Sequence, residues 1–298
     1  MLYKFEKPKV SLAHGIRALK SDRLWLFYAL AGVAFFYLSL IWKASSNIDH
    51  ITTDLAFWSA ILWLLWKKKD RLRHYYAPYS SFIGLLFLTV VLSRTLFLFE
   101  FEAIFLSFVP VCAMLPILLI ASGFRGLSQY GRELFFTLLL FFPTGALGFF
   151  LDDIFQITIL NAKVATYFLY YIGFNTTSQG NQVILSLPEL GTFKAIVNFS
   201  CAGIPMILLM LKLALIFISC ISLSKKQQVL IPAFSLGLGF LLGVIRVCLL
   251  TLLIPNRVQF DYWHGNQGSQ IFSTAAIMIF SGFCYWILEK NQQPVVSD

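Results

Sequence analysis

Long apolar runs alternate with short polar segments along almost the entire chain. A helix needs about 20 predominantly apolar residues to cross a hydrocarbon core of roughly 30 Å. The pattern predicts about eight such spans in one integral membrane domain over residues 1–298, and hence an all-α polytopic membrane protein. The predicted spans are 24–42, 51–66, 77–93, 103–122, 133–151, 202–223, 229–254 and 270–288.

The longest interruption of this pattern is 152–200, which we predict to be extracytoplasmic. Its first part, 154–172, is apolar but rich in Tyr and includes Gln156, Asn161 and Lys163. We therefore expect an interfacial or shallow re-entrant helix there rather than a ninth span. Beyond it, apolar and polar positions alternate around Ser186 between turn-forming residues, which predicts a small β-hairpin against the membrane surface.

The positive charges orient the spans, because short cytoplasmic loops carry an excess of Lys and Arg. If 1–23 is a basic cytoplasmic N-terminus continuing into a signal-anchor, 16 of the 23 cations lie on the inside. Both termini are then cytoplasmic, with five spans in 24–151, a three-span region in 201–288 and a tail at 289–298. The inside cations are Lys4, Lys7, Lys9, Arg17, Lys20, Arg23, Lys67, Lys68, Lys69, Arg71, Arg73, Arg125, Arg132, Lys225, Lys226 and Lys290.

The composition excludes several classes of protein. Hydrophobic residues make up 58% of the chain and charged residues 12%, against about 45–50% and about 25% in soluble domains. A soluble enzyme, a disordered chain and a disulfide framework are therefore excluded. Most of the cations behind the net charge of +9 lie in predicted cytoplasmic segments, where they orient the spans in the membrane. We therefore expect no nucleic-acid partner. The chain has no zinc motif and no Gly-rich phosphate loop, and we expect no metal, cofactor or nucleotide.

Arg246 stands out because it falls inside a predicted span, eight to nine residues before Pro255. That spacing places it roughly 12–13 Å below the end of the helix. One interpretation is an Arg whose long side chain snorkels to the headgroups, at the limit of its reach. We favour a polar cavity facing the bundle interior, since an ionisable residue within a span is a functional candidate by default.

Cys201 differs from the other four cysteines, which lie in predicted spans. It falls at the predicted outer boundary, where a span begins, and no outer loop holds a second cysteine to pair with it. The thiol is a candidate nucleophile at the start of a helix, with Ser200 or Asn198 available as a cap. The alternative is a small cysteine buried at the interface.

His264 lies in the outer loop between the last two predicted spans, on the same side of the membrane as Cys201. Histidine is the side chain best suited to moving protons near neutral pH. Together the residues make a nucleophile, a base and a cation, with Arg246 stabilising a developing oxyanion or orienting the substrate. Asp261 is a candidate for orienting His264, although a plain surface carboxylate is the simpler interpretation.

Three short blocks carry a family resemblance: Cys-Ala-Gly at 201–203, Gly-Val-Ile-Arg-Val at 243–247 and His-Gly-Asn-Gln-Gly at 264–268. They resemble the signature blocks of the exosortase/archaeosortase family. Members of that family are polytopic membrane cysteine transpeptidases that process proteins with a C-terminal sorting tag. The tag consists of a short motif, a transmembrane helix and a basic cluster. The resemblance covers roughly 160–290 and is most specific over 198–268.

The resemblance implies a role for each candidate residue. Cys201 would be the nucleophile, Arg246 the family's cation and His264 the proton carrier. It also implies a multi-pass protein of the bacterial cytoplasmic membrane, with an extracytoplasmic active site and a membrane-tethered protein substrate. Ala202 and Gly243 depart from the Ser and Asn of many members, which indicates a divergent branch such as the cyanobacterial exosortases.

Lys212 supports a different class of function. It lies eleven residues after Cys201, almost three helical turns, so both face one way about 16 Å apart. With Arg246 it would suit a transporter or flippase for a lipid-linked or anionic substrate. A transporter is expected to show internal repeats, and we find none in the sequence. The third class is a non-catalytic scaffold. In a scaffold the three candidate residues would have no common reason to lie on the same side of the membrane.

Overall fold

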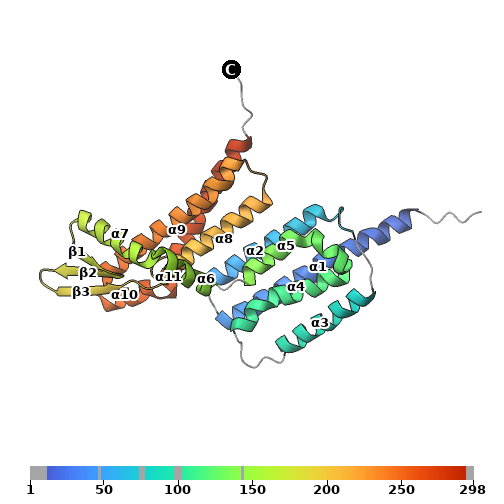
Figure 1. The fold of residues 1–298 in the computed structure, drawn as a ribbon, viewed down its shortest axis with the longest axis horizontal. Helices are drawn as coiled ribbons and strands as arrows, with labels where there is room; N and C mark the ends of the chain where they lie inside the picture. Colours follow the sequence, from blue (N-terminus) through green and yellow to red (C-terminus); the bar gives the residue numbers. More distant parts are fainter. Residues whose placement is uncertain (1–11, 46–47, 74–77, 97–102, 142–143, 293–298) are drawn as a thin grey trace, which may run out of the picture. The chain divides into compact units, whose positions relative to one another are not determined.

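The computed structural model describes residues 12–45, 48–73, 78–96, 103–141 and 144–292 (Figure 1). The elements form two compact units. Unit 1 comprises Met1–Ser46 and Asp54–Phe141, and unit 2 comprises Asn47–Thr53 and Phe142–Asp298. The prediction of a single integral membrane domain includes both units and stays a prediction.

Unit 1 is a bundle of helices arranged around α4, which packs against α1, α3 and α5. The close packing of α3 on α4 depends on Gly84, where a Cβ atom would lie 2.7 Å from the Pro116 carbonyl oxygen. The elements are α1 (Leu12–Ser45), α2 (Ile48–Lys68), α3 (Pro78–Leu96), α4 (Ala103–Gly126), the 3-10 helix η1 (Leu127–Tyr130) and α5 (Gly131–Phe141).

Lys68, one of the cations expected to orient the chain, also stabilises unit 1. Its Nζ donates to the Glu133 carboxylate and to the Gln129 carbonyl oxygen, each at 2.6 Å. Glu133 is only 1% exposed, and a buried carboxylate is costly unless it is paired. The pair therefore joins the end of α2 to the first turn of α5.

Unit 2 holds all three candidate residues. Its α7 packs against β1, β2 and α9, while α8 packs along α9 (Figure 1). The three antiparallel strands follow the order β1-β2-β3. The elements are α6 (Thr144–Phe155), α7 (Ile157–Ile172), β1 (Asn175–Gln179), β2 (Gln182–Leu187), β3 (Gly191–Ile196), α8 (Ile204–Cys220), α9 (Lys225–Leu253), α10 (Arg257–His264) and α11 (Asn266–Gln292).

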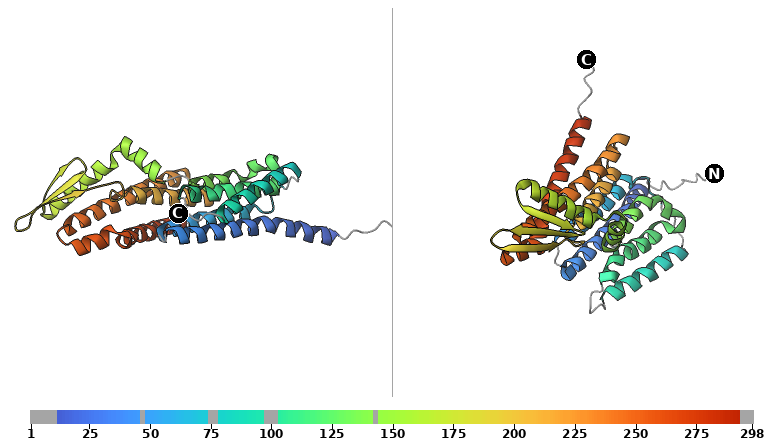
Figure 2. Two further views of the ribbon diagram at one scale, coloured as in Figure 1. Left: turned by 90° about the horizontal axis from the view of Figure 1, so that it is seen from below. Right: turned by 60° about the vertical axis from the view of Figure 1, so that its left-hand side comes forward.

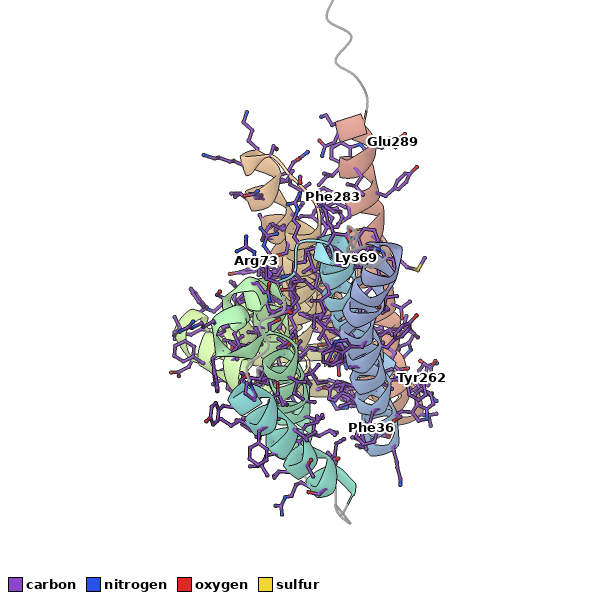
Figure 3. All side chains as sticks on the ribbon, turned by 90° about the vertical axis from the view of Figure 1, so that its right-hand side faces the viewer. Phe36, Lys69, Arg73, Tyr262, Phe283 and Glu289 are labelled. Atoms are coloured by element: carbon purple, nitrogen blue, oxygen red, sulfur yellow. The ribbon has the colours of Figure 1, made fainter. Side chains whose placement is uncertain are left out.

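In unit 2, the lysines predicted to be cytoplasmic and the sheet lie at opposite ends. At one end, the Gln227 side chain in the first turn of α9 donates to Asn291 of α11 at 2.7 Å, close to Lys225, Lys226 and Lys290. The sheet and α10 lie at the other end (Figure 2). Figure 3 likewise shows Tyr262 of α10 and Glu289 of α11 at opposite ends of the unit. The cations predicted to be inside in this part of the chain therefore gather at the end without the sheet.

The polytopic helical fold is confirmed. Within the described residues, five helices are long and apolar enough to cross a membrane, and Ile204–Cys220 is a shorter apolar helix. The exact number of eight spans stays a prediction. The five are Leu24–Ala44, Pro78–Thr95, Leu106–Phe141, Lys225–Leu253 and Asn266–Asn291.

The single span predicted at 133–151 stays a prediction. Within the described residues, that range includes two helices: α5 ends at Phe141 and belongs to unit 1, and α6 begins at Thr144 and belongs to unit 2.

The segment 152–200 contains the expected helix and strands, with one strand more than a hairpin. Helix α7 buries one face, including Asn161 and Ala165, and exposes aromatic residues such as Tyr167 and Tyr171 on the other. Such a two-faced helix is typical of a membrane interface. In the sheet, the alternating residues Val183 and Leu185 are fully buried, as the pattern around Ser186 predicts.

Candidate functional site

Cys201 lies in a turn between β3 and α8 that is organised by Asn198. The Cys201 N–H donates to both the backbone and side-chain oxygens of Asn198, each at 3.0 Å. The same backbone oxygen accepts from Ala202 N–H at 2.9 Å, and the side chain accepts from Ser200 Oγ at 2.9 Å. Helix α8 begins at Ile204, two residues later than the predicted span, so Cys201 precedes the helix. The Cys201 side chain is buried, at 5% exposure.

The backbones of two elements touch directly behind this turn. Gly203, the residue before α8, has a φ of +74°, a conformation that glycine adopts without strain. A Cβ atom at Gly203 would lie 2.7 Å from the Gly243 Cα atom of α9, and one at Gly243 would lie 2.9 Å from the Gly203 Cα atom. Any larger side chain at either position would separate α9 from the turn that carries Cys201.

Asn161 of α7 holds the same turn from another side. Its side chain is fully buried, and its Nδ2 donates to the Ala202 carbonyl oxygen at 3.0 Å. Its Oδ1 has no hydrogen-bond partner among the described residues. From the sequence alone, Asn161 is only a polar residue of a predicted interfacial helix. Its position beside the small residue Ala162 and one turn before Ala165 was the available signal of a buried helical face.

Arg246 of α9 joins the segments of the other two candidate residues. Its Nη1 donates to the Ser200 carbonyl oxygen at 3.1 Å, and its Nη2 donates to the His264 carbonyl oxygen at 3.3 Å. The side chain is 6% exposed, which matches a residue held inside the protein and not one that snorkels to headgroups.

His264 is the last residue of α10, and its side chain is exposed. The imidazole stacks on Phe260, with ring centroids 5.3 Å apart and planes 11° apart. The Asp261 carboxylate accepts a hydrogen bond from Arg257 Nε at 3.1 Å. Within the described part of the chain it makes no hydrogen bond to His264, so Asp261 is placed as an exposed member of an ion pair.

A cavity of about 200 Å³ brings Cys201 and His264 together. Arg246 and Lys212 are not among its lining residues, although Val247, next to Arg246, is. Among the described residues, no group of three or more His, Cys, Asp or Glu side chains is placed to hold a metal ion. The lining residues are Lys194, Ala195, Ile196, Val197, Cys201, Val247, Leu250, Thr251, Ile254, Arg257, Phe260 and His264.

Comparison with protein families matches residues 42–281 to the family described as Transmembrane exosortase. The matched range begins well before 160, so it also includes much of unit 1, which the three short blocks do not reach. Neither the curated proteins nor the solved structures include a match. Because the family match extends over most of the sequence, this chain belongs to the transmembrane exosortases.

Proposed function

We propose that the protein is a cysteine peptidase or transpeptidase that removes the C-terminal sorting signal of exported proteins through a thioester on Cys201. Membership of the exosortase family supports a sorting role in the membrane. The observation that carries the finer proposal is the shared cavity: the Cys201 thiol and the His264 imidazole line one space of about 200 Å³.

The proposed reaction has two steps. In the first, Cys201 Sγ attacks the carbonyl carbon of the scissile peptide bond as His264 takes up the thiol proton. The C–N bond then breaks, His264 returns the proton to the leaving amine, and the C-terminal tag departs. In the second step, water or an acceptor amine attacks the thioester carbonyl, the C–S bond breaks, and the product leaves with the thiol restored.

The proposed role of Arg246 is to hold the reacting groups at a fixed separation. Its two nitrogen atoms donate to backbone oxygens on either side of the site, those of Ser200 and His264. A fixed geometry matters because misplacing reacting groups by about 1 Å can cost on the order of 100-fold in rate.

The proposed active site faces the extracytoplasmic side of the bacterial cytoplasmic membrane, and both termini are cytoplasmic. Two observations on unit 2 support this orientation. The candidate residues belong to the end with the sheet and α10, whereas Lys225, Lys226 and Lys290 belong to the opposite end. Cytoplasmic segments are the ones enriched in Lys and Arg.

Cysteine labelling tests this orientation. A Val258→Cys variant, in which the residue replaced is 81% exposed on α10, is expected to react with a membrane-impermeant maleimide on intact cells. The matched Lys226→Cys variant, at the start of α9, is expected to react only after the membrane is permeabilised. The unsubstituted protein sets the background from its five natural cysteines. The reverse pattern of labelling would show that the orientation is wrong.

Mass spectrometry of a processed substrate tests the reaction. The protein is co-expressed with an exported reporter that carries a C-terminal tag of motif, transmembrane helix and basic cluster, taken from a protein of the same organism. We expect the reporter to lose the helix and basic cluster, with a new C-terminus within or next to the motif. A free carboxylate at that end indicates hydrolysis, and the added mass of an acceptor indicates transfer. A reporter that keeps its tag would contradict the proposed function.

The transporter alternative depended on Lys212 acting together with Arg246. The structure places Lys212 on α8, half-buried, and the cavity at the site is lined by Cys201 and His264 without it. The cavity that supports the peptidase proposal therefore involves neither Lys212 nor Arg246 as a lining residue.

A further inference from the structure

The third strand of the sheet has an open edge. In the order β1-β2-β3, strand β3 pairs only with β2 within the described residues. The pairing continues one residue beyond the strand, where the Val197 N–H donates to the Asn181 carbonyl oxygen at 2.9 Å. Val197 therefore directs its backbone groups toward β2.

The register determines which residues of β3 direct their backbone N–H and C=O groups away from β2. In an antiparallel pair, alternate residues direct their N–H and C=O groups to the partner, and the residues between them direct these groups away. Since the backbone groups of Val197 are directed toward β2, those of Ala195 are as well. The N–H and C=O groups of Lys194 and Ile196 are directed away from β2. Thr192 also points outward, nearer the start of the strand.

The cavity at Cys201 lies along this open edge. Four consecutive residues, 194–197, line it. Successive side chains of a strand point to opposite faces of the sheet, so a cavity lined by consecutive residues meets the strand at its edge and not at one face. Phe260 and His264 of α10 line the same cavity. The open backbone groups and the thiol therefore face one space.

We infer that the substrate segment carrying the scissile bond binds in extended form as a fourth strand on the edge of β3. This rests on the proposed function, which makes Cys201 the nucleophile. Outward N–H and C=O groups repeating every second residue are complementary to another extended backbone, the mode of recognition known as β-augmentation.

Proline substitution tests the backbone contact. Ile196→Pro removes one outward N–H and none of the β2 hydrogen bonds, and an edge strand tolerates such a proline. We expect kcat/KM for removal of the reporter's tag to fall about 5- to 10-fold, mainly through KM. Ile196→Ala loses the side chain but keeps the N–H, and is expected to cost about 2-fold. Ser178→Pro is the matched control, because Ser178 directs its N–H away from β2 on the opposite edge of the sheet, in β1, and does not line the cavity; it should leave the rate unchanged.

Two outcomes of this series would overturn the inference. One is an Ile196→Pro variant that processes the reporter like the unsubstituted protein. The other is an Ile196→Ala variant that loses as much activity as Ile196→Pro, because the side chain and not the backbone would then be the contact. If Ile196→Pro fails to insert or fold, the cross-linking experiment below decides the question.

Cross-linking tests the extended conformation directly. In an Ile196→Cys, Cys201→Ala protein, which cannot form the thioester, single cysteines are placed in turn along the reporter segment preceding its transmembrane helix. We expect disulfide yields to alternate with a period of two residues, because side chains of a paired strand alternate between faces. A flat yield, a helical period, no cross-link, or cross-links only between two copies of β3 would each overturn the inference.

The inference and the proposed function can fail separately. Cross-links in the double variant report binding without chemistry. If the unsubstituted protein cleaves the reporter and the yields do not alternate, the fourth strand is wrong and the peptidase stands. If the unsubstituted protein leaves the reporter intact, the proposed function is wrong whatever the pattern of cross-links.

Discussion

Replacing Cys201 with Ala is expected to lower the rate of tag removal at least about 10,000-fold, because the covalent route is lost with its nucleophile. The loss should appear in kcat. The amount of protein in the membrane should change little, since alanine keeps the backbone N–H that donates to Asn198 and the buried side chain shrinks by one atom. The measurement is the fraction of reporter processed over time in membranes with equal amounts of enzyme.

Cys284→Ala is the matched control, because Cys284 of α11 has the same exposure, 5%, and packs in a different cluster from Cys201. It is expected to process the reporter at close to the unsubstituted rate. Cys201→Ser keeps the size and polarity of the side chain with a far weaker nucleophile, so it should resemble Cys201→Ala. Substantial processing by Cys201→Ala would exclude the thioester mechanism.

The second large effect is expected at Arg246. Arg246→Met keeps much of the volume and removes both hydrogen bonds, leaving the Ser200 and His264 carbonyl oxygens without their donor. A hydrogen bond to a charged group contributes about 1.5–3 kcal/mol, and each 1.4 kcal/mol is tenfold in rate. We therefore expect kcat/KM to fall roughly 100- to 10,000-fold, measured with the same reporter.

Arg246→Lys separates two roles for the cation. A lysine keeps the charge but lacks the planar fork that donates in two directions. If Arg246 holds the two segments together, the Lys variant should lose nearly as much activity as the Met variant. If its charge stabilises an oxyanion, the Lys variant should retain most of the activity. Arg125→Lys, a substitution at an exposed residue of unit 1, serves as the control for the exchange itself and should have no effect.

The sequence was most informative where a residue contradicted its surroundings. In a chain with 12% charged residues, one Arg within an apolar span pointed to a site, and the short blocks around Cys201 and His264 pointed to a family. The structure brings the segments of these three residues together. Their presence on one side of the membrane followed from counting spans, but their convergence required hydrogen bonds between segments far apart in the sequence.

Other features could not be predicted because they depend on tertiary contacts. Ala162 and Ala165 indicate a buried helical face beside Asn161, but the sequence does not show which group that face contacts, so the bond from Asn161 to the Cys201 turn could not be predicted. The third strand was missed for a similar reason, since every residue of 191–196 is exposed or half-buried and the alternation of apolar and polar positions is weak there.

The contact between Gly203 and Gly243 determines both how closely α9 approaches the turn of Cys201 and where the Arg246 side chain points. Gly243 and Arg246 are three residues apart on α9, so they share a face of the helix, and the point where the backbones touch also sets the direction of the guanidinium. An insertion of one residue between them would turn the arginine by about 100° without disturbing the glycine contact. The number of residues between Gly243 and Arg246 therefore decides whether the guanidinium reaches the Ser200 and His264 carbonyl oxygens.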